Sequence, residues 1–191
     1  MIPALIVLAV LLLVPTLFAV AMYNGLVSIR NQVDEAWSDV DTELKRRYDL
    51  IPNLVATVQG YAKHERELLE RVTELRGRAS ANHGSPRSQA ADESALEGAL
   101  GQLRIRLEAY PDLKASDSFL ALQRELSNTE DRIQAALRFY NGNVRENNNK
   151  VEQFPSNLVA RLGGFGQREF FELKAAAERE APAVDLGRGR G

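Results

Sequence analysis

The 191-residue chain contains no cysteine. This absence excludes disulfides, thiolate metal sites and cysteine nucleophiles, and leaves the redox compartment open. Histidine is also scarce, with two residues. A zinc-protease helix that used His64 would need a second histidine at position 68, which is Leu68, and the chain has no pair of Glu-x-x-His motifs for a di-iron site. We therefore expect no metal and no cofactor.

Strong charge and strand patterning are missing as well. The formal net charge is only -2, which gives no reason to expect nucleic acid as a partner. No segment alternates apolar and polar residues with a period of two, so we predict an all-α protein. No nucleophile, base and oxyanion site can be assembled from the motifs, and no small-molecule substrate is evident, so we expect no enzymatic activity.

The first charged side chain of the sequence is Arg30, and Ile2–Met22 is almost entirely apolar. A helix of about 20 such residues crosses the hydrocarbon core of a membrane. We predict a single-pass transmembrane anchor over residues 1–24, with residues 2–22 in contact with lipid. A cleaved signal peptide is the alternative, because Ala19-Val20-Ala21 resembles a cleavage site. However, a basic leading region is missing and the apolar run exceeds the roughly 7–15 residues of a signal peptide.

The orientation of the anchor is predicted from its flanking charges. No Lys or Arg precedes the apolar run, whereas Arg30 and Lys45–Arg47 follow it. The positive-inside rule then favours a cytoplasmic domain, but only Arg30 is close to the membrane.

Apolar residues after the anchor recur at spacings of four and three, as on one face of a long helix. This first stripe breaks at Arg47 and Glu65, and consists otherwise of Val33, Trp37, Val40, Leu44, Ile51, Leu54, Val58, Tyr61, Leu68, Val72 and Leu75. A second stripe from Phe119 to Phe154 breaks at Glu130 and Asn147. A buried unpaired charge is unfavourable by several kcal/mol. The three charged positions therefore either reach solvent or form a buried polar network.

The remaining segments are divided by turn and cap signals. Residues 77–93 are rich in Gly, Ser, Ala and Asn and are predicted to be a mobile loop, after which Ser94-x-x-Glu97 opens a helix to about residue 109 as a capping box. A connector spans residues 110–116. We predict further helices at 117–154, 156–162 and 168–180, and a disordered tail over 181–191, so that residues 25–180 form the helical domain.

The segment LKRRYDLIPNLV, residues 44–55, decides how the helices are arranged. Either one long, kinked helix runs through Pro52, or the chain turns back at residues 48–50. In the second case Asp49 caps a new helix with Pro52 in its first turn. Capping and burial favour the turn, which gives an antiparallel up-and-down four-helix bundle with helices near 25–47, 50–77, 94–109 and 117–154. The segment would then be a corner at the membrane-distal tip.

Several motifs, in this order, resemble the LemA family of bacterial membrane-anchored proteins. They are YNGLVSIRNQVDEAWSDV, LKRRYDLIPNLVATVQGYAKHE, EAYPDLKAS, FLALQRELSNTEDRI, FYNGNV and FPSNL, followed by GF and FF. The resemblance implies one N-terminal membrane helix, a helical bundle and no established enzymatic activity.

These observations together predict a membrane-anchored helical scaffold or adaptor in the bacterial inner membrane. It would bind other envelope proteins or itself. A membrane-remodelling protein and, less favoured, a divergent hydrolase using His64, Glu65 and Glu130 are the alternatives. The candidate residues for the polar network or interaction surface are Arg47, Asp49, Asn53, Glu65, Glu130, Tyr140, Asn141 and Asn148.

Overall fold

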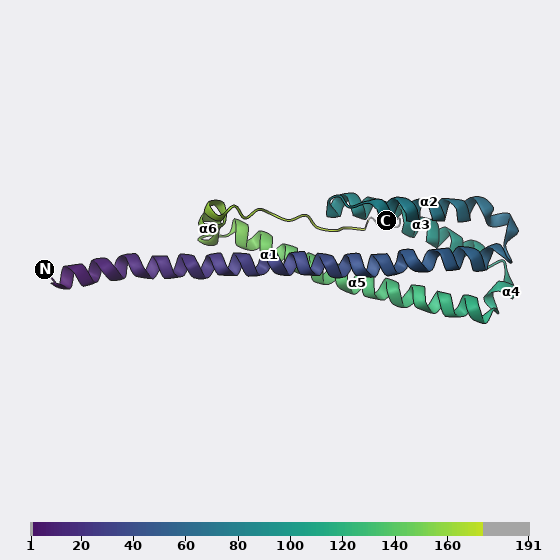
Figure 1. The fold of residues 1–191 in the computed structure, drawn as a ribbon, viewed down its shortest axis with the longest axis horizontal. Helices are drawn as coiled ribbons and strands as arrows, with labels where there is room; N and C mark the ends of the chain where they lie inside the picture. The colour runs from purple at the N-terminus through teal and green to yellow at the C-terminus, as the bar shows by residue number, and fades with distance from the viewer. Residues whose placement is uncertain (1, 174–191) are drawn as a thin grey trace, which may run out of the picture.

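The computed structural model describes residues 2–173, and every regular element in that range is a helix (Figure 1). The predictions of an all-α protein and of a long apolar helix near the N-terminus are confirmed. In chain order the elements are α1 (Ile2–Gln59), the short 3-10 helix η1 (Lys63–Glu65), α2 (Arg66–Ala81), α3 (Pro86–Leu107), α4 (Pro111–Lys114), α5 (Asp117–Glu152) and α6 (Ser156–Gly163).

The 58-residue helix α1 runs without a break through both Pro15 and Pro52. Within the described residues, it is the one helix long and apolar enough to cross a membrane, with a mean hydropathy of 2.0 in its most apolar stretch. The side chains of residues 9–20 are exposed, as expected for a segment that faces lipid. From Leu26 to Val58 the same helix carries the predicted apolar stripe, which is buried.

The predicted turn at residues 48–50 is not present, and the alternative of a long helix through Pro52 is correct. Proline has no N–H to donate to the carbonyl four residues earlier, which here belongs to Tyr48. Arg76 of α2 replaces the missing donor, because its Nε donates to the Tyr48 carbonyl at 3.0 Å. Asp49 therefore caps no helix, and LKRRYDLIPNLV is an internal segment of α1 rather than a corner.

We expect Arg76→Met to lower the free energy of unfolding by about 1 kcal/mol, because the Tyr48 carbonyl loses this bond. In a Pro52→Ala background the same substitution should have a smaller effect, because the Ala N–H can reach that carbonyl. Urea unfolding of the two single variants and the double variant measures the coupling. Equal effects of Arg76→Met in both backgrounds would contradict this explanation.

The chain turns back at residues 60–65, immediately after α1. The Tyr61 and Ala62 amides both donate to the Val58 carbonyl, which closes the end of the helix. The hydroxyl of Tyr110, in the connector before α4, donates to Glu65 Oε1 at 3.3 Å. The membrane-distal end of the molecule is therefore formed by this turn and the 110–116 connector (Figure 1).

Most of the predicted loop over 77–93 is helical, which corrects that expectation. Only residues 82–85 separate α2 from α3. Ser85 caps α3 by accepting a hydrogen bond from the Ser88 amide, and Pro86 occupies the first turn, where a missing N–H is harmless. The predicted capping serine, Ser94, lies inside α3 and donates to the Ala90 carbonyl.

The helices α1, α2, α3 and α5 alternate in direction, but they do not cover one another equally (Figure 1). Helix α5 packs along α1, while α2 and α3 form a hairpin beside the distal part of α1. Their common core contains the buried apolar residues from Val33 of α1 to Val144 of α5. Only α1 continues beyond this body, toward the N-terminus.

The C-terminal part of the described chain returns along α5. Gly164, with φ of 69°, ends α6 in the left-handed conformation that glycine adopts readily. Residues 165–173 then form an irregular segment, which we call the strap. The prediction of a helix from residue 168 is therefore wrong up to residue 173. Its remainder and the predicted tail lie outside the described residues.

Candidate functional site

The first cluster of polar side chains surrounds Arg47 in the core. Its guanidinium donates from Nη1 to Glu130 Oε2 at 2.9 Å and from Nη2 to Glu93 Oε2. Tyr48 donates its hydroxyl hydrogen to Glu93 Oε1, and Gln89 donates to the Tyr48 hydroxyl at 3.4 Å. This Arg47 cluster ties α1, α3 and α5 together at one level.

Burial sets the electrostatics of this cluster. Glu93 is fully buried, and burial raises the pKa of its carboxyl above the ordinary value of 4.5, although the charge of Arg47 lowers it. Burial also raises the pKa of Tyr48. The pKa of Glu97 is raised by burial and by the nearby charge of Glu130. The ionised form of Glu93 therefore depends on Arg47.

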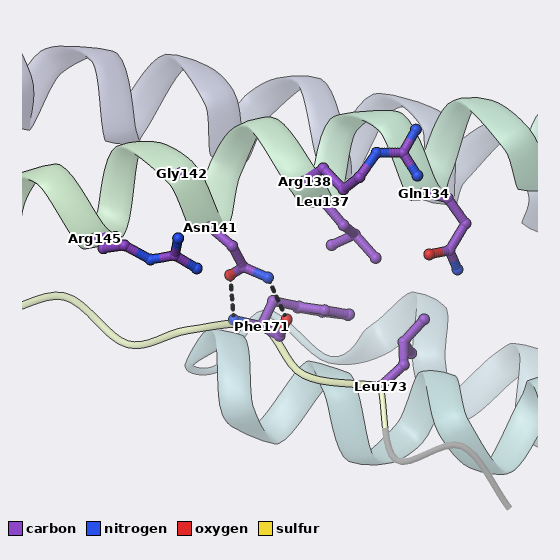
Figure 2. Close-up of a pocket in the computed structure, with 8 residues that line it drawn as sticks. All are labelled: Gln134, Leu137, Arg138, Asn141, Gly142, Arg145, Phe171 and Leu173. Atoms are coloured by element: carbon purple, nitrogen blue, oxygen red, sulfur yellow. Dashed lines mark hydrogen bonds between the residues drawn. The ribbon is translucent and has the colours of Figure 1, made fainter. Parts of the chain in front are cut away.

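The second cluster holds the strap against α5 through asparagine side chains. Asn141 donates to the Phe171 carbonyl at 2.8 Å and accepts from the Phe171 amide at 3.0 Å (Figure 2). Asn148 makes the same pair of bonds with the main chain of Arg168, at 3.0 Å and 2.8 Å. We call these two asparagines and their bonds the asparagine clamp.

The clamp fits an extended chain because two repeats match. Asn141 and Asn148 are seven residues apart, which is two helical turns or roughly 10.5 Å along α5. Arg168 and Phe171 are three residues apart, which is roughly 10 Å in an extended chain. Both bonds of each asparagine go to the main chain, so the clamp recognises backbone rather than side-chain identity.

Further contacts fasten the strap between the clamped residues and beside them. The hydroxyl of Tyr140 donates to the Glu169 carbonyl at 2.8 Å, and Asn147 donates to the Gly166 carbonyl at 3.1 Å. The Phe171 ring is buried, with its centroid 5.9 Å from that of Trp37. Burial raises the pKa of Tyr140 to about 12.

A groove of about 410 Å³ opens where the described strap ends (Figure 2). Helix α5 lines it from Gln134 to Arg145, and Phe171 and Leu173 line it from the strap. Arg138 and Arg145 are both exposed at its edge. Gln134 lies one further seven-residue step from Asn141, so the face of α5 that carries the clamp continues into the groove.

Three of the predicted site residues lie outside both clusters. Asp49 is exposed, with Oδ1 3.9 Å from Arg76 Nη2, and Asn53 is exposed on α1. Glu65 is at the distal turn beside Tyr110. The structure brings together Arg47 with Glu130, and Tyr140 with Asn141 and Asn148.

Comparison with known proteins places the chain. A sequence model described as the LemA family matches residues 36–186. The chain belongs to the LemA family. It is 32% identical over 137 residues to Protein LemA of Metamycoplasma hominis, an alignment that covers 72% of this chain and 63% of that protein's length.

Two further relatives of this LemA-family chain have other names. Magnetosome protein MamQ 2 of Paramagnetospirillum magneticum is 25% identical over 201 residues, covering 92% of this chain and 74% of that protein. Magnetosome protein MamQ of Magnetospirillum gryphiswaldense is 23% identical over 181 residues, covering 82% and 66%. Together with the apolar α1, the family identifies a membrane-associated helical protein.

Sequence reasoning missed several residues of this LemA-family protein that complete the two clusters. Glu93 and Gln89 were assigned to a loop, yet extending the leucine stripe of α3 backward from Leu96 by steps of three and four reaches both positions. The strap was missed because residues from 168 were predicted to be helical. No local pattern in residues 165–173 indicates that they pair with α5.

Proposed function

We propose that the protein is a membrane-anchored helical scaffold of the bacterial inner membrane that binds an envelope protein or a second copy of itself, and that it catalyses no reaction. The asparagine clamp is the observation that carries this proposal. A surface that holds main chain in an extended conformation suits the capture of extended segments of different sequence. The occupant in this structure is the chain's own strap.

The groove beside the clamp supports this function. It continues along α5 past the last clamped residue, Phe171, and its exposed edge carries two arginines. An extended partner segment could therefore lie along α5 beyond the strap, with its acidic side chains next to Arg138 and Arg145. The soluble domain is proposed to lie on the cytoplasmic side, as the flanking charges favour.

The hydrolase alternative has little support from the positions of its residues. Glu65 contacts Tyr110 at the distal turn, whereas Glu130 binds Arg47, twelve residues before the end of α1 (59 − 47 = 12), or roughly 18 Å along the helix. Within residues 2–173, no three His, Asp or Glu side chains are grouped so as to hold a metal ion. The names of the relatives mention no reaction.

Site-specific photocrosslinking in membranes tests the scaffold. A photoreactive residue at Arg138, at the edge of the groove, should form adducts with another protein or a second copy. The matched control is the same residue at Ile105, which is 71% exposed on α3. Recovery of monomer alone from Arg138, or the same adducts from both positions, would contradict the proposed function.

A further inference from the structure

Helix α6 lies at the end of the helical body that faces the apolar part of α1 (Figure 1). It packs on α1 through Ala160, which shares a buried cluster with Leu26 and Phe165. Leu26 is four residues beyond Met22 (26 − 22 = 4), the last residue of the apolar run, which is roughly 6 Å along the helix. The structure therefore places α6 at the height of the membrane surface.

The contacts that fix α6 at this height come from its C-terminal end. The ring of Phe165 meets the ring of Tyr23 edge-on, with centroids 5.4 Å apart. The guanidinium of Arg30 lies 5.3 Å from the centroid of the same ring. At Gly163 an added Cβ would lie 2.7 Å from Phe165. This close packing attaches α6 to α1 directly beyond the apolar run.

The opposite face of this region is apolar and exposed. Leu158 and Leu162 are four residues apart on one side of α6, with 52% and 91% of their surfaces exposed. Phe154, four residues earlier in the sequence, is 80% exposed. Ala160 on the other side is fully buried. Three large apolar side chains are thus left uncovered at the end of the body that faces the membrane.

A lipid bilayer is the occupant that fits this position. The exposed residues continue the apolar surface that α1 presents from Val10 to Val20. Interfacial helices combine one apolar face carrying Phe or Leu with a polar face, and lie at the boundary between headgroups and acyl chains. Exposed Arg161 on α6 and the half-exposed ring of Tyr23 are residue types that favour this boundary.

We propose that α6 is an interfacial helix, with Phe154, Leu158 and Leu162 inserted at the lipid surface. The protein then holds the membrane at two points, the apolar part of α1 and the apolar face of α6. Because α6 also leads into the strap, this second contact places the asparagine clamp at a defined distance from the bilayer. The contact is independent of the partner bound along α5.

Spin-label accessibility in full-length protein tests this contact, and the lack of cysteine makes single labelling straightforward. A nitroxide at Leu162→Cys is compared with one at Ile105→Cys, which is exposed on α3. The protein is reconstituted in nanodiscs of phosphatidylethanolamine and phosphatidylglycerol. We expect the ratio of oxygen to nickel-chelate accessibility to be several-fold higher at 162 than at 105, because oxygen concentrates in lipid and the chelate stays in water.

Two results would overturn the interfacial helix. Equal ratios at positions 162 and 105 would place α6 in water, and protection of the Leu162 label from both reagents would place protein over it. Unfolding is not expected to confuse the result, because both side chains are exposed; circular dichroism of each variant verifies this. Crosslinking from Arg138 reports on the scaffold separately, so either proposal can fail alone.

Discussion

Replacing Arg47 with methionine is expected to lower the free energy of unfolding by about 3–5 kcal/mol, the range for removing one partner of a buried ion pair. Glu93 would remain buried without its guanidinium partner, and Glu130 would lose the same ligand. The loss should be smaller at about pH 5 than at about pH 8. Burial raises the pKa of Glu93, so a larger fraction of this carboxyl is neutral in acid and needs no cation.

Two further variants separate the lost charge pair from a simple loss of side-chain volume. Lys45→Met removes an exposed cation from the same helix and should change stability by less than about 0.5 kcal/mol. Arg47→Met combined with Glu93→Gln should recover much of the loss, because no buried charge then lacks a partner. Urea unfolding measures all three. If the double variant were as unstable as Arg47→Met alone, the explanation by an unpaired charge would be wrong.

Replacing Asn141 with alanine is expected to release the strap while leaving the rest of the fold in place. The Phe171 amide and carbonyl lose both of their side-chain partners, which weakens attachment by about 1–3 kcal/mol, or roughly fivefold to more than a hundredfold in the detached fraction. Limited proteolysis with trypsin should then cut faster after Arg168, which the intact clamp holds by its main chain.

The matched control is Asn149→Ala, an exposed asparagine on the same helix. It should leave the rate of cleavage after Arg168 unchanged, and circular dichroism should be the same for both variants. Cleavage that is equally fast in the native protein and in Asn141→Ala would mean that the asparagine clamp does not hold the strap.

The buried face of α1 could be predicted from sequence because it depends on local periodicity. Val33, Val40 and Leu44 recur at helical spacing and are buried as predicted. The course of the chain at Pro52 could not be predicted in the same way. The helix continues because Arg76, 28 residues beyond Tyr48, donates to the carbonyl that proline leaves free. A compensation from a different helix is not visible in the local pattern.

The two polar clusters were predictable to different degrees. Charges at Arg47 and Glu130 interrupt apolar stripes, which marks them as unusual before their partner is known. Glu93 was hidden by a Gly- and Ser-rich composition, although Ser85-Pro86 carries the signal for a helix start. The asparagine-rich segment of α5 was recognisable as polar and concentrated. Its partner was not, because pairing Asn141 with Phe171 requires the strap to be extended.

The positions of the clamp and of α6 connect the fold to the proposed scaffold. Helix α1 carries the body away from the membrane, and α5 brings the chain back to it (Figure 1). The asparagine clamp lies on the returning half of α5, so an extended segment is held between the Arg47 cluster and the membrane. A partner bound there would meet the protein close to the bilayer.

Amide hydrogen exchange of the native, full-length protein in nanodiscs tests the clamp most directly. The amides of Arg168 and Phe171 donate to Asn148 Oδ1 and Asn141 Oδ1, so both should be protected. The exposed strap residue between them, Phe170, should exchange faster. Protection at 168 and 171 that is lost in Asn141→Ala is the result we predict, whereas rapid exchange at both amides in the native protein would contradict the account.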